Sequence, residues 1–194
     1  MENLNFVIPE IFISLSIMIL LIIGVFKKNS STLIYSLSII TLLISLGLII
    51  NFPSDQEIYL FNDSYKIDQL STFMKIVTII SGIFVLISSY HYAKLEKIFK
   101  IEYSILILCS ILGMIVMIGS HDLIVFYIGL ELQSLSLYVL SAFNRNNIKS
   151  SEAGLKYFVL SALSSGILLY GCSLIYGYSG STNFNIIAEN ILFS

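Results

Sequence analysis

Glu131 is the residue most suited to chemistry, because it is the only charged side chain between Asp122 and Arg145, within a strongly apolar stretch. A helix rises about 1.5 Å per residue and the hydrocarbon core of a bilayer is about 30 Å thick, so Glu131 is expected near mid-membrane. A charge at that depth is costly unless it is paired, hydrated or neutralised. Glu131 is therefore interpreted as a proton-binding group. The alternative is a protonated carboxyl that only forms a hydrogen bond between helices.

Lys156 is the second candidate, and two interpretations of it stay open. It follows Glu152 by four residues, which is the usual spacing of a surface ion pair on a helix, and a lysine near the membrane boundary can extend to the head groups. Alternatively, Lys156 faces Glu131 from a neighbouring helix. At roughly 7 Å and an effective dielectric constant of about 20, two unit charges interact by about 2.4 kcal/mol, or nearly two pKa units. That coupling would let Lys156 control the proton on Glu131.

Four other ionisable residues lie in or near apolar segments, and each has an ordinary structural interpretation. Glu10 follows Pro9 at the start of the first apolar segment, where an acid suits a helix N-terminus. Lys75 is expected to extend its side chain toward the membrane surface. His91 and His121 lie near segment ends and are expected to anchor helices rather than carry protons.

Composition indicates an integral membrane protein. Hydrophobic residues make up 57% of the 194 residues and charged residues 11%, and the mean hydropathy is +0.92. A net charge of −2 without a basic tract argues against a nucleic-acid partner. Cys109 and Cys172 lie in apolar segments without CxxC spacing, so no metal site is expected. No pattern pairs a nucleophile with a base or forms a phosphate-binding glycine loop.

The predicted fold is an all-α polytopic bundle that forms one transmembrane domain over residues 1–194. Long apolar runs mark six spans, followed by a polar, interfacial tail over 179–194. The connection Gly119–Asp122 is so short that the fourth and fifth spans must be antiparallel neighbours. The spans are expected near 6–26, 32–52, 69–92, 103–120, 122–143 and 151–178.

Basic residues predict the orientation in the membrane. The loops after the first, third and fifth spans hold seven of them, whereas the alternate loops hold only Lys66. Because positively charged loops stay on the cytoplasmic side, those three loops are expected in the cytoplasm or matrix and the N-terminus on the opposite side. The seven are Lys27, Lys28, Lys94, Lys97, Lys100, Arg145 and Lys149.

The segments around both candidate residues resemble a known family. The chain reads GLELQSLSLYVL over 129–140 and SEAGLKYFVL over 151–160, with weaker agreement back to Pro9-Glu10. Together with GMIVM at 113–117 and SSGILLYG at 164–171, these motifs resemble subunit N of proton-pumping NADH:quinone oxidoreductase, respiratory complex I.

The resemblance implies roles, partners and a location. It implies an antiporter-like fold of about fourteen helices, a proton-channel glutamate at Glu131 and a companion lysine at Lys156. It implies a non-redox subunit of a translocase in the bacterial inner membrane (less so the mitochondrial one), among other membrane subunits and lipid. NADH, flavin, iron–sulfur clusters and quinone would belong to the whole complex, with no cofactor in this chain.

The resemblance also predicts that the chain is an N-terminal fragment. Family members carry a further lysine in a broken seventh helix, which this sequence does not reach, so its proton path would be incomplete. Two other functions stay open: a subunit of a multi-subunit cation/proton antiporter, and a structural membrane subunit in which Glu131 is inert.

Overall fold

The computed structural model describes residues 2–27, 30–51, 57–96 and 98–192. Six helices in it are long and apolar enough to cross a membrane, so the predicted all-α, six-span bundle is confirmed. A 3-10 helix, η1 (Glu2–Val7), precedes them, and a short helix, α7 (Phe184–Leu192), lies in the predicted polar tail. The six are α1 (Ile8–Phe26), α2 (Ser31–Asn51), α3 (Gln69–Leu95), α4 (Ile101–Gly119), α5 (Leu123–Ser141) and α6 (Ile148–Ser179).

Capping side chains set where three of the helices begin. The Asp68 carboxylate accepts the Ser71 N–H at 2.7 Å and starts α3. Asp122 accepts the Ile124 N–H at 2.7 Å and starts α5. Asn147 accepts the Lys149 N–H at 3.0 Å, so α6 begins three residues before the predicted 151.

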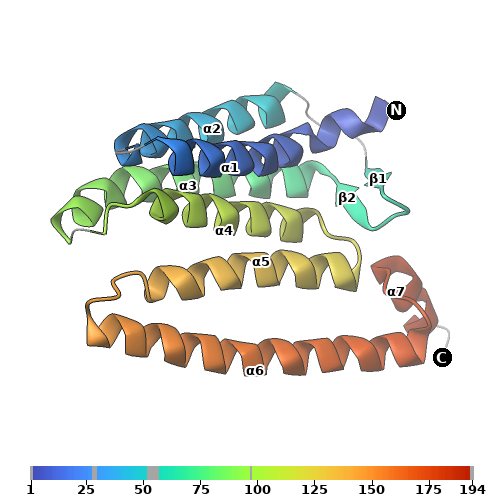
Figure 1. Ribbon diagram of the computed structural model, residues 1–194. Coiled ribbons are helices and arrows are strands. Elements are labelled where there is room, and N and C mark those ends of the chain that lie inside the picture. The colour runs from blue at the N-terminus through green and yellow to red at the C-terminus, as the bar shows by residue number, and fades with distance from the viewer. Residues whose placement is uncertain (1, 28–29, 52–56, 97, 193–194) are drawn as a thin grey trace.

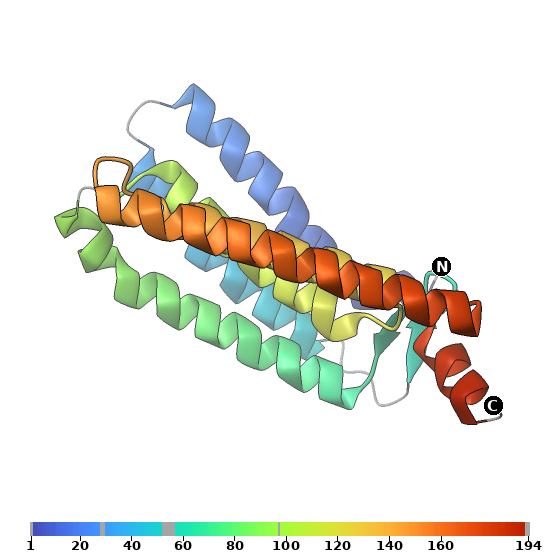
Figure 2. The same ribbon diagram turned by 90° about the horizontal axis from the view of Figure 1, so that it is seen from below.

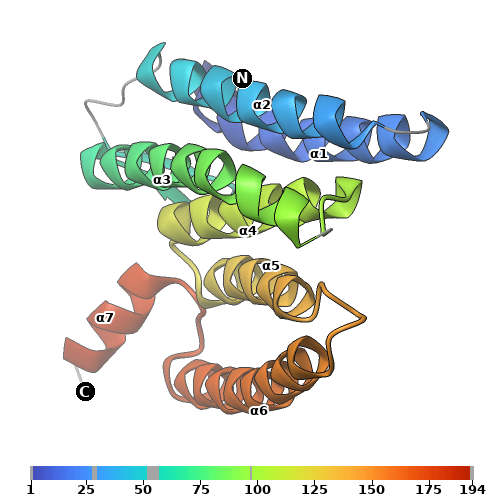
Figure 3. The same cartoon turned by 90° about the vertical axis from the view of Figure 1, so that its left-hand side faces the viewer.

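Helices α1 to α4 form a compact group, and α5 and α6 extend it to one side (Figures 1 and 3). In Figure 2, which is seen from below, α6 crosses the bundle as its outermost helix. In the part of α6 that the structure describes, only Gly154 is buried. The most deeply buried apolar side chains all come from the first four helices: Ile13, Ile34, Leu42, Ile79, Leu86, Leu108, Ile111 and Ile115.

The antiparallel neighbours α4 and α5 meet backbone to backbone. A Cβ added to Gly113 would lie 2.6 Å from the Gln133 nitrogen, and one added to Gly129 would lie 2.8 Å from the Met117 nitrogen. Small residues at such contacts let membrane helices approach closely. These contacts form the seam between α4 and α5 and fix the register of the two helices. Glu131 lies between Gly129 and Gln133, so it is level with segment 113–117 of α4.

A second close contact sets the register of α5 and α6 near their connecting loop. A Cβ on Gly154 would lie 2.3 Å from the Ala142 Cβ. One turn deeper, the Tyr138 and Tyr157 rings pack edge to face with centroids 4.8 Å apart. Residue 142, directly after the end of α5, is thus level with residue 154 of α6. Eleven residues back along α5, Glu131 is level with about residue 165 of α6.

The sequence did not predict the β-hairpin that lies between α2 and α3. Its strands, β1 (Ile58–Leu60) and β2 (Tyr65–Ile67), pair antiparallel, with Leu60 opposite Tyr65. Residues 61–63 between the strands all have positive φ, from 54° to 61°. Tyr65 and Ile67 are buried against Val7, so the hairpin closes one end of the bundle over the start of α1.

Three segments are joined at the hairpin end of the bundle. The Thr182 hydroxyl donates to the Asp122 carboxylate at 2.5 Å, and the Leu123 N–H donates to the Thr182 carbonyl at 3.0 Å. The Asn183 amide donates to the Asp63 carbonyl at 3.0 Å. These bonds hold the end of α6 to the α4–α5 connection and to the hairpin.

Candidate functional site

Glu131 lies near the middle of α5 and has a carboxyl oxygen without a hydrogen-bond partner among the described residues. Its side chain is half-buried, and Oε1 is inaccessible to solvent without a hydrogen-bond partner among the described residues. A buried carboxylate oxygen without a partner is costly, and protonation removes that cost. Glu131 therefore has the surroundings of a group that can bind a proton.

Lys156 lies near the loop end of α6 and has a partner on its own helix. Its ammonium donates to the Glu152 carboxylate at 2.5 Å, and both side chains are more than half exposed, at 68% and 57%. The first interpretation of the sequence, an ordinary pair of residues four apart, is confirmed. Among the described residues, no ion pair joins Lys156 to Glu131.

The register of α5 and α6 places Lys156 closer than Glu131 to the loop that joins these helices. Glu131 is level with about residue 165, some nine residues beyond Lys156, and nine residues span about 13 Å of helix. The contact between Gly154 and Ala142 causes this offset, because it holds Lys156 beside the α5–α6 loop. The geometry concerns distance alone, and the relay roles of both residues stay predictions.

The structure shows a second, buried ion pair that sequence reasoning missed. The Lys75 ammonium donates to Glu10 Oε1 at 2.6 Å, and the two side chains are only 3% and 7% exposed. The Tyr65 hydroxyl donates to the same oxygen at 3.0 Å. Glu10 Oε2 is buried with no partner among the described residues. The expectation that Lys75 reaches toward the membrane surface is therefore wrong.

A periodic signal in the sequence could have found the pair. Lys75 shares its helix face with the buried residues Ser71, Ile79 and Leu86, at helical spacings of four, four and seven. Glu10 occupies the buried face of α1 with Ile13, Ile17 and Leu20 in the same way. A charged residue in the register of a buried face is expected to find a partner inside the bundle.

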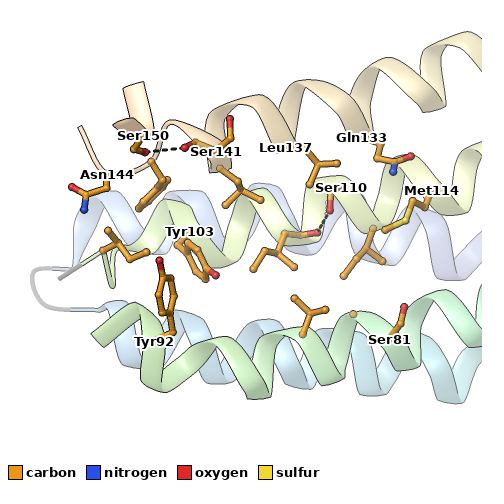
Figure 4. A pocket seen from close by; sticks show the side chains of 17 residues that line it. Ser81, Tyr92, Tyr103, Ser110, Met114, Gln133, Leu137, Ser141, Asn144 and Ser150 are labelled. Atoms are coloured by element: carbon orange, nitrogen blue, oxygen red, sulfur yellow. Dashed lines mark hydrogen bonds between the residues drawn. The ribbon is translucent and has the colours of Figure 1, made fainter. Parts of the chain in front are cut away.

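A pocket of about 490 Å³ between α3, α4 and α5 is polar at the loop end of the bundle (Figure 4). Asn144, Ser150 and Tyr92 line that end, and Gln133 lies at the deep end. Ser150 donates to the Ser141 carbonyl at 2.8 Å there. Neither Glu131 nor Lys156 lines this pocket. Glu131 is two residues from the lining residue Gln133, and residues two apart on a helix point to different sides.

The two histidines lie near helix ends, as the sequence suggested. His121 packs edge-on against Tyr59 and Phe184, with centroids 5.3 and 5.9 Å away. His91 packs against Tyr90 at 5.8 Å. Cys109 and Cys172 are free thiols, and the described residues contain no group of three or more metal-binding side chains.

This arrangement of helices matches chains of two respiratory membrane complexes. The fold matches a chain of respiratory complex I from Thermus thermophilus with bound aureothin, with a TM-score of 0.77 and 22% identity over 90% of this chain and 38% of that one. It also matches a chain of the membrane-bound sulfane sulfur reductase, an archaeal respiratory membrane complex, with a TM-score of 0.81 and 21% identity over 94% and 39%. A family model described as NADH:quinone oxidoreductase/Mrp antiporter, transmembrane, matches residues 120–194.

Sequence relatives narrow this class to one family. NADH-quinone oxidoreductase subunit N of Pelagibacter ubique is 68% identical over 97% of this chain and 40% of its own length. The subunit N of Bartonella bacilliformis is 47% identical over 96% and 38%. The chain belongs to the family of NADH-quinone oxidoreductase subunit N. It spans about 40% of the length of these curated relatives.

Proposed function

We propose that this chain is part of a non-redox subunit of a bacterial NADH-quinone oxidoreductase, in which Glu131 binds and releases protons during their translocation. The observation that carries the proposal is the buried, unpartnered Oε1 of Glu131 in the middle of a spanning helix. The relatives that share this sequence are named as subunits of that oxidoreductase, which supports the same conclusion.

Protonation of Glu131 is the chemical step that the chain contributes. In a low-dielectric environment the neutral carboxylic acid is favoured, and the carboxylate forms when a positive charge approaches. Lys156 is the positive charge that we propose approaches Glu131, and its ammonium is held by Glu152 near the loop end of α6. We expect that release of Lys156 from Glu152 brings the ammonium closer to Glu131 and favours the carboxylate.

The remaining assignments rest on the family and on loop charge. We place the N-terminus and the hairpin on the periplasmic side of the inner membrane, since the basic residues gather in the opposite loops. NADH, flavin, iron–sulfur clusters and quinone are assigned to other parts of the complex. Other membrane subunits and lipid are the expected neighbours, and the long apolar surface of α6 supports that expectation.

The test is Glu131→Gln in the assembled complex in native membranes. We expect electron transfer from NADH to quinone to persist while the number of protons pumped per NADH falls. Glu102→Gln, at the loop end of α4, is the matched control and should leave both rates unchanged. Undiminished pumping by Glu131→Gln would mean that Glu131 is inert, as in the structural alternative.

A cation/proton antiporter subunit is the second candidate, because the matching family model covers Mrp antiporters as well. The two functions differ in the ion that is exchanged. We expect pumping that is independent of Na⁺ and driven by NADH. Proton movement that follows an imposed Na⁺ gradient without NADH would favour the antiporter.

A further inference from the structure

We propose that Glu10, Lys75 and Tyr65 form a second proton-binding centre, separated from Glu131 by α4 and open toward the hairpin side of the membrane. The proposal rests on proton translocation being the function of the subunit. It assigns a role to three residues that the Glu131 pathway does not use.

The two oxygens of Glu10 have different surroundings, and this difference is the main support for a binding centre. Oε1 accepts from both Lys75 Nζ, at 2.6 Å, and the Tyr65 hydroxyl, at 3.0 Å. Oε2 is buried and accepts from no described residue. A buried ion pair that serves stability alone is expected to have its remaining lone pairs satisfied by further hydrogen bonds. No described residue satisfies the lone pairs of Oε2.

A proton on Oε2 leaves the other contacts undisturbed. One proton from water binds Oε2 and converts the Glu10 carboxylate to a neutral acid, while Lys75 keeps its ammonium and Tyr65 its hydroxyl. The centre changes from net neutral to net positive, and release of the same proton to water restores it. The Lys75 ammonium also lies 5.0 Å from the Tyr65 ring centroid, which stabilises it in either state.

Tyr65 holds its own proton throughout this cycle. Burial, followed by the nearby charge of Glu10 and the hydrogen bond to Glu10, raises the pKa of Tyr65 well above 10.0. The hydroxyl is therefore a fixed hydrogen-bond donor at any physiological pH. It orients Oε1 and leaves Oε2 as the oxygen that titrates.

Access to the centre comes from the hairpin. Glu10 lines a pocket of about 260 Å³ together with Phe61 and Ser64 of the hairpin turn. A second, small cavity beside it is lined by Glu10 and Lys75. Apart from Glu10, Lys75 and Tyr65, no titratable side chain lines either space among the described residues. A proton that enters from the hairpin side therefore meets Glu10 first.

The new centre and Glu131 lie at similar depth. The Tyr65 hydroxyl oxygen is 3.5 Å from the carbonyl oxygen of Ile115, and Glu131 is level with segment 113–117. Helix α4 separates the two, as Figures 1 and 3 show. A positive charge gained by the new centre disfavours a further proton on Glu131, so the two centres load alternately.

The experiment compares two ion pairs of the assembled complex in native membranes. The variants are Glu10→Gln, Lys75→Met and the double variant, and the matched control is Glu57→Gln with Lys66→Met. Glu57 and Lys66 also lie 2.9 Å apart on the hairpin side, but Glu57 is 59% exposed. Protons pumped per NADH oxidised are measured together with the amount of assembled complex.

The double variant separates proton binding from a structural role. Without either charge the interior holds no unpaired ion, so assembly should recover relative to the single variants. We expect pumping per NADH to stay at least twofold below wild type in the double variant and unchanged in the control. Full recovery of pumping along with assembly would overturn the second centre and leave a structural ion pair.

Infrared difference spectra provide an independent reading. We expect a protonated-carboxyl band that appears on turnover and is lost in Glu10→Gln but kept in Glu57→Gln. A spectrum with no Glu10-dependent band overturns the proposal. Its failure is distinct from failure of the main function, because that function is tested by Glu131→Gln alone.

Discussion

Two of the acid–lysine pairs among the described residues have nearly equal lengths but opposite surroundings. Glu10 and Lys75 join α1 to α3 within the group formed by α1 to α4. Their charged atoms are 2.6 Å apart, and both side chains are almost fully buried. Glu152 and Lys156 join two turns of α6 at 2.5 Å, and both are exposed. The difference shows that the distance between the charges does not by itself determine how much such a pair contributes to stability. Burial decides whether the loss of one partner leaves a charge in water or in the protein interior.

Removal of one charge from each pair should give the largest contrast. Lys75→Met leaves Glu10 buried without its cation, and we expect a loss of about 3–5 kcal/mol in stability. Lys156→Met removes a pair on a helix surface, which contributes only about 0.3–0.5 kcal/mol. Thermal unfolding of the detergent-solubilised complex measures both. Equal effects of the two substitutions would contradict the burial argument.

Glycine substitutions at a packed and at an exposed helix position should also differ in their effect on stability, but by less than the two ion pairs. Gly113→Ala places a methyl group 2.6 Å from backbone atoms of α5, which cannot move aside as a side chain could, and we expect about 1–3 kcal/mol of destabilisation. Gly166→Ala on α6 meets no atom within 4 Å and serves as the control. Protease susceptibility of the α4–α5 connection reports the opening of the seam. Unchanged digestion of Gly113→Ala would mean that the two helices are not in contact there.

The smallest expected effect is the pH response of the exposed hairpin pair. The hydrogen bond from Lys66 lowers the pKa of Glu57 below its ordinary 4.5, and the same bond raises the pKa of Lys66 above 10.5. The acid therefore stabilises the hairpin above pH 4.5 and loses this contribution as the pH falls through its lowered pKa. The lysine stabilises it below pH 10.5 and loses this contribution as the pH rises through its raised pKa.

Amide hydrogen exchange at Tyr59 and Lys66 measures this response. We expect protection to be constant from about pH 5 to 10, after correction for intrinsic exchange, and to fall outside that window. Glu57→Gln should remove the loss of protection at low pH, called here the acid limb, and leave the protection of α3 unchanged. An acid limb that persists in Glu57→Gln would assign the response to a different group.

The spans and the surface pair of α6 could be predicted from sequence because both depend on local pattern. Hydropathy located all six helices to within a few residues, and the short connection Gly119–Asp122 identified α4 and α5 as neighbours. The spacing of Glu152 and Lys156 predicted their contact, because residues four apart on a helix meet whatever surrounds them.

The features that were missed depend on how helices pack. The 13 Å offset between Glu131 and Lys156 follows from the contact of Gly154 with Ala142, and no local pattern states which residues of two helices meet. The hairpin has strands of three residues and is stabilised by docking onto Val7 rather than by its own length. The distance of Lys75 from the helix end favours the membrane surface, whereas its helical face, shared with Ile79, places it in the interior of the bundle.

The contact between Glu10 and Lys75 also constrains how the chain enters the membrane during synthesis. The two residues are 65 positions apart, which at about 5–20 residues per second corresponds to roughly 3–13 s of translation. A lysine alone at that position in a nascent helix opposes insertion. Helix α1 must therefore remain beside the insertion machinery until α3 arrives, so that Glu10 of α1 can form its ion pair with Lys75 of α3.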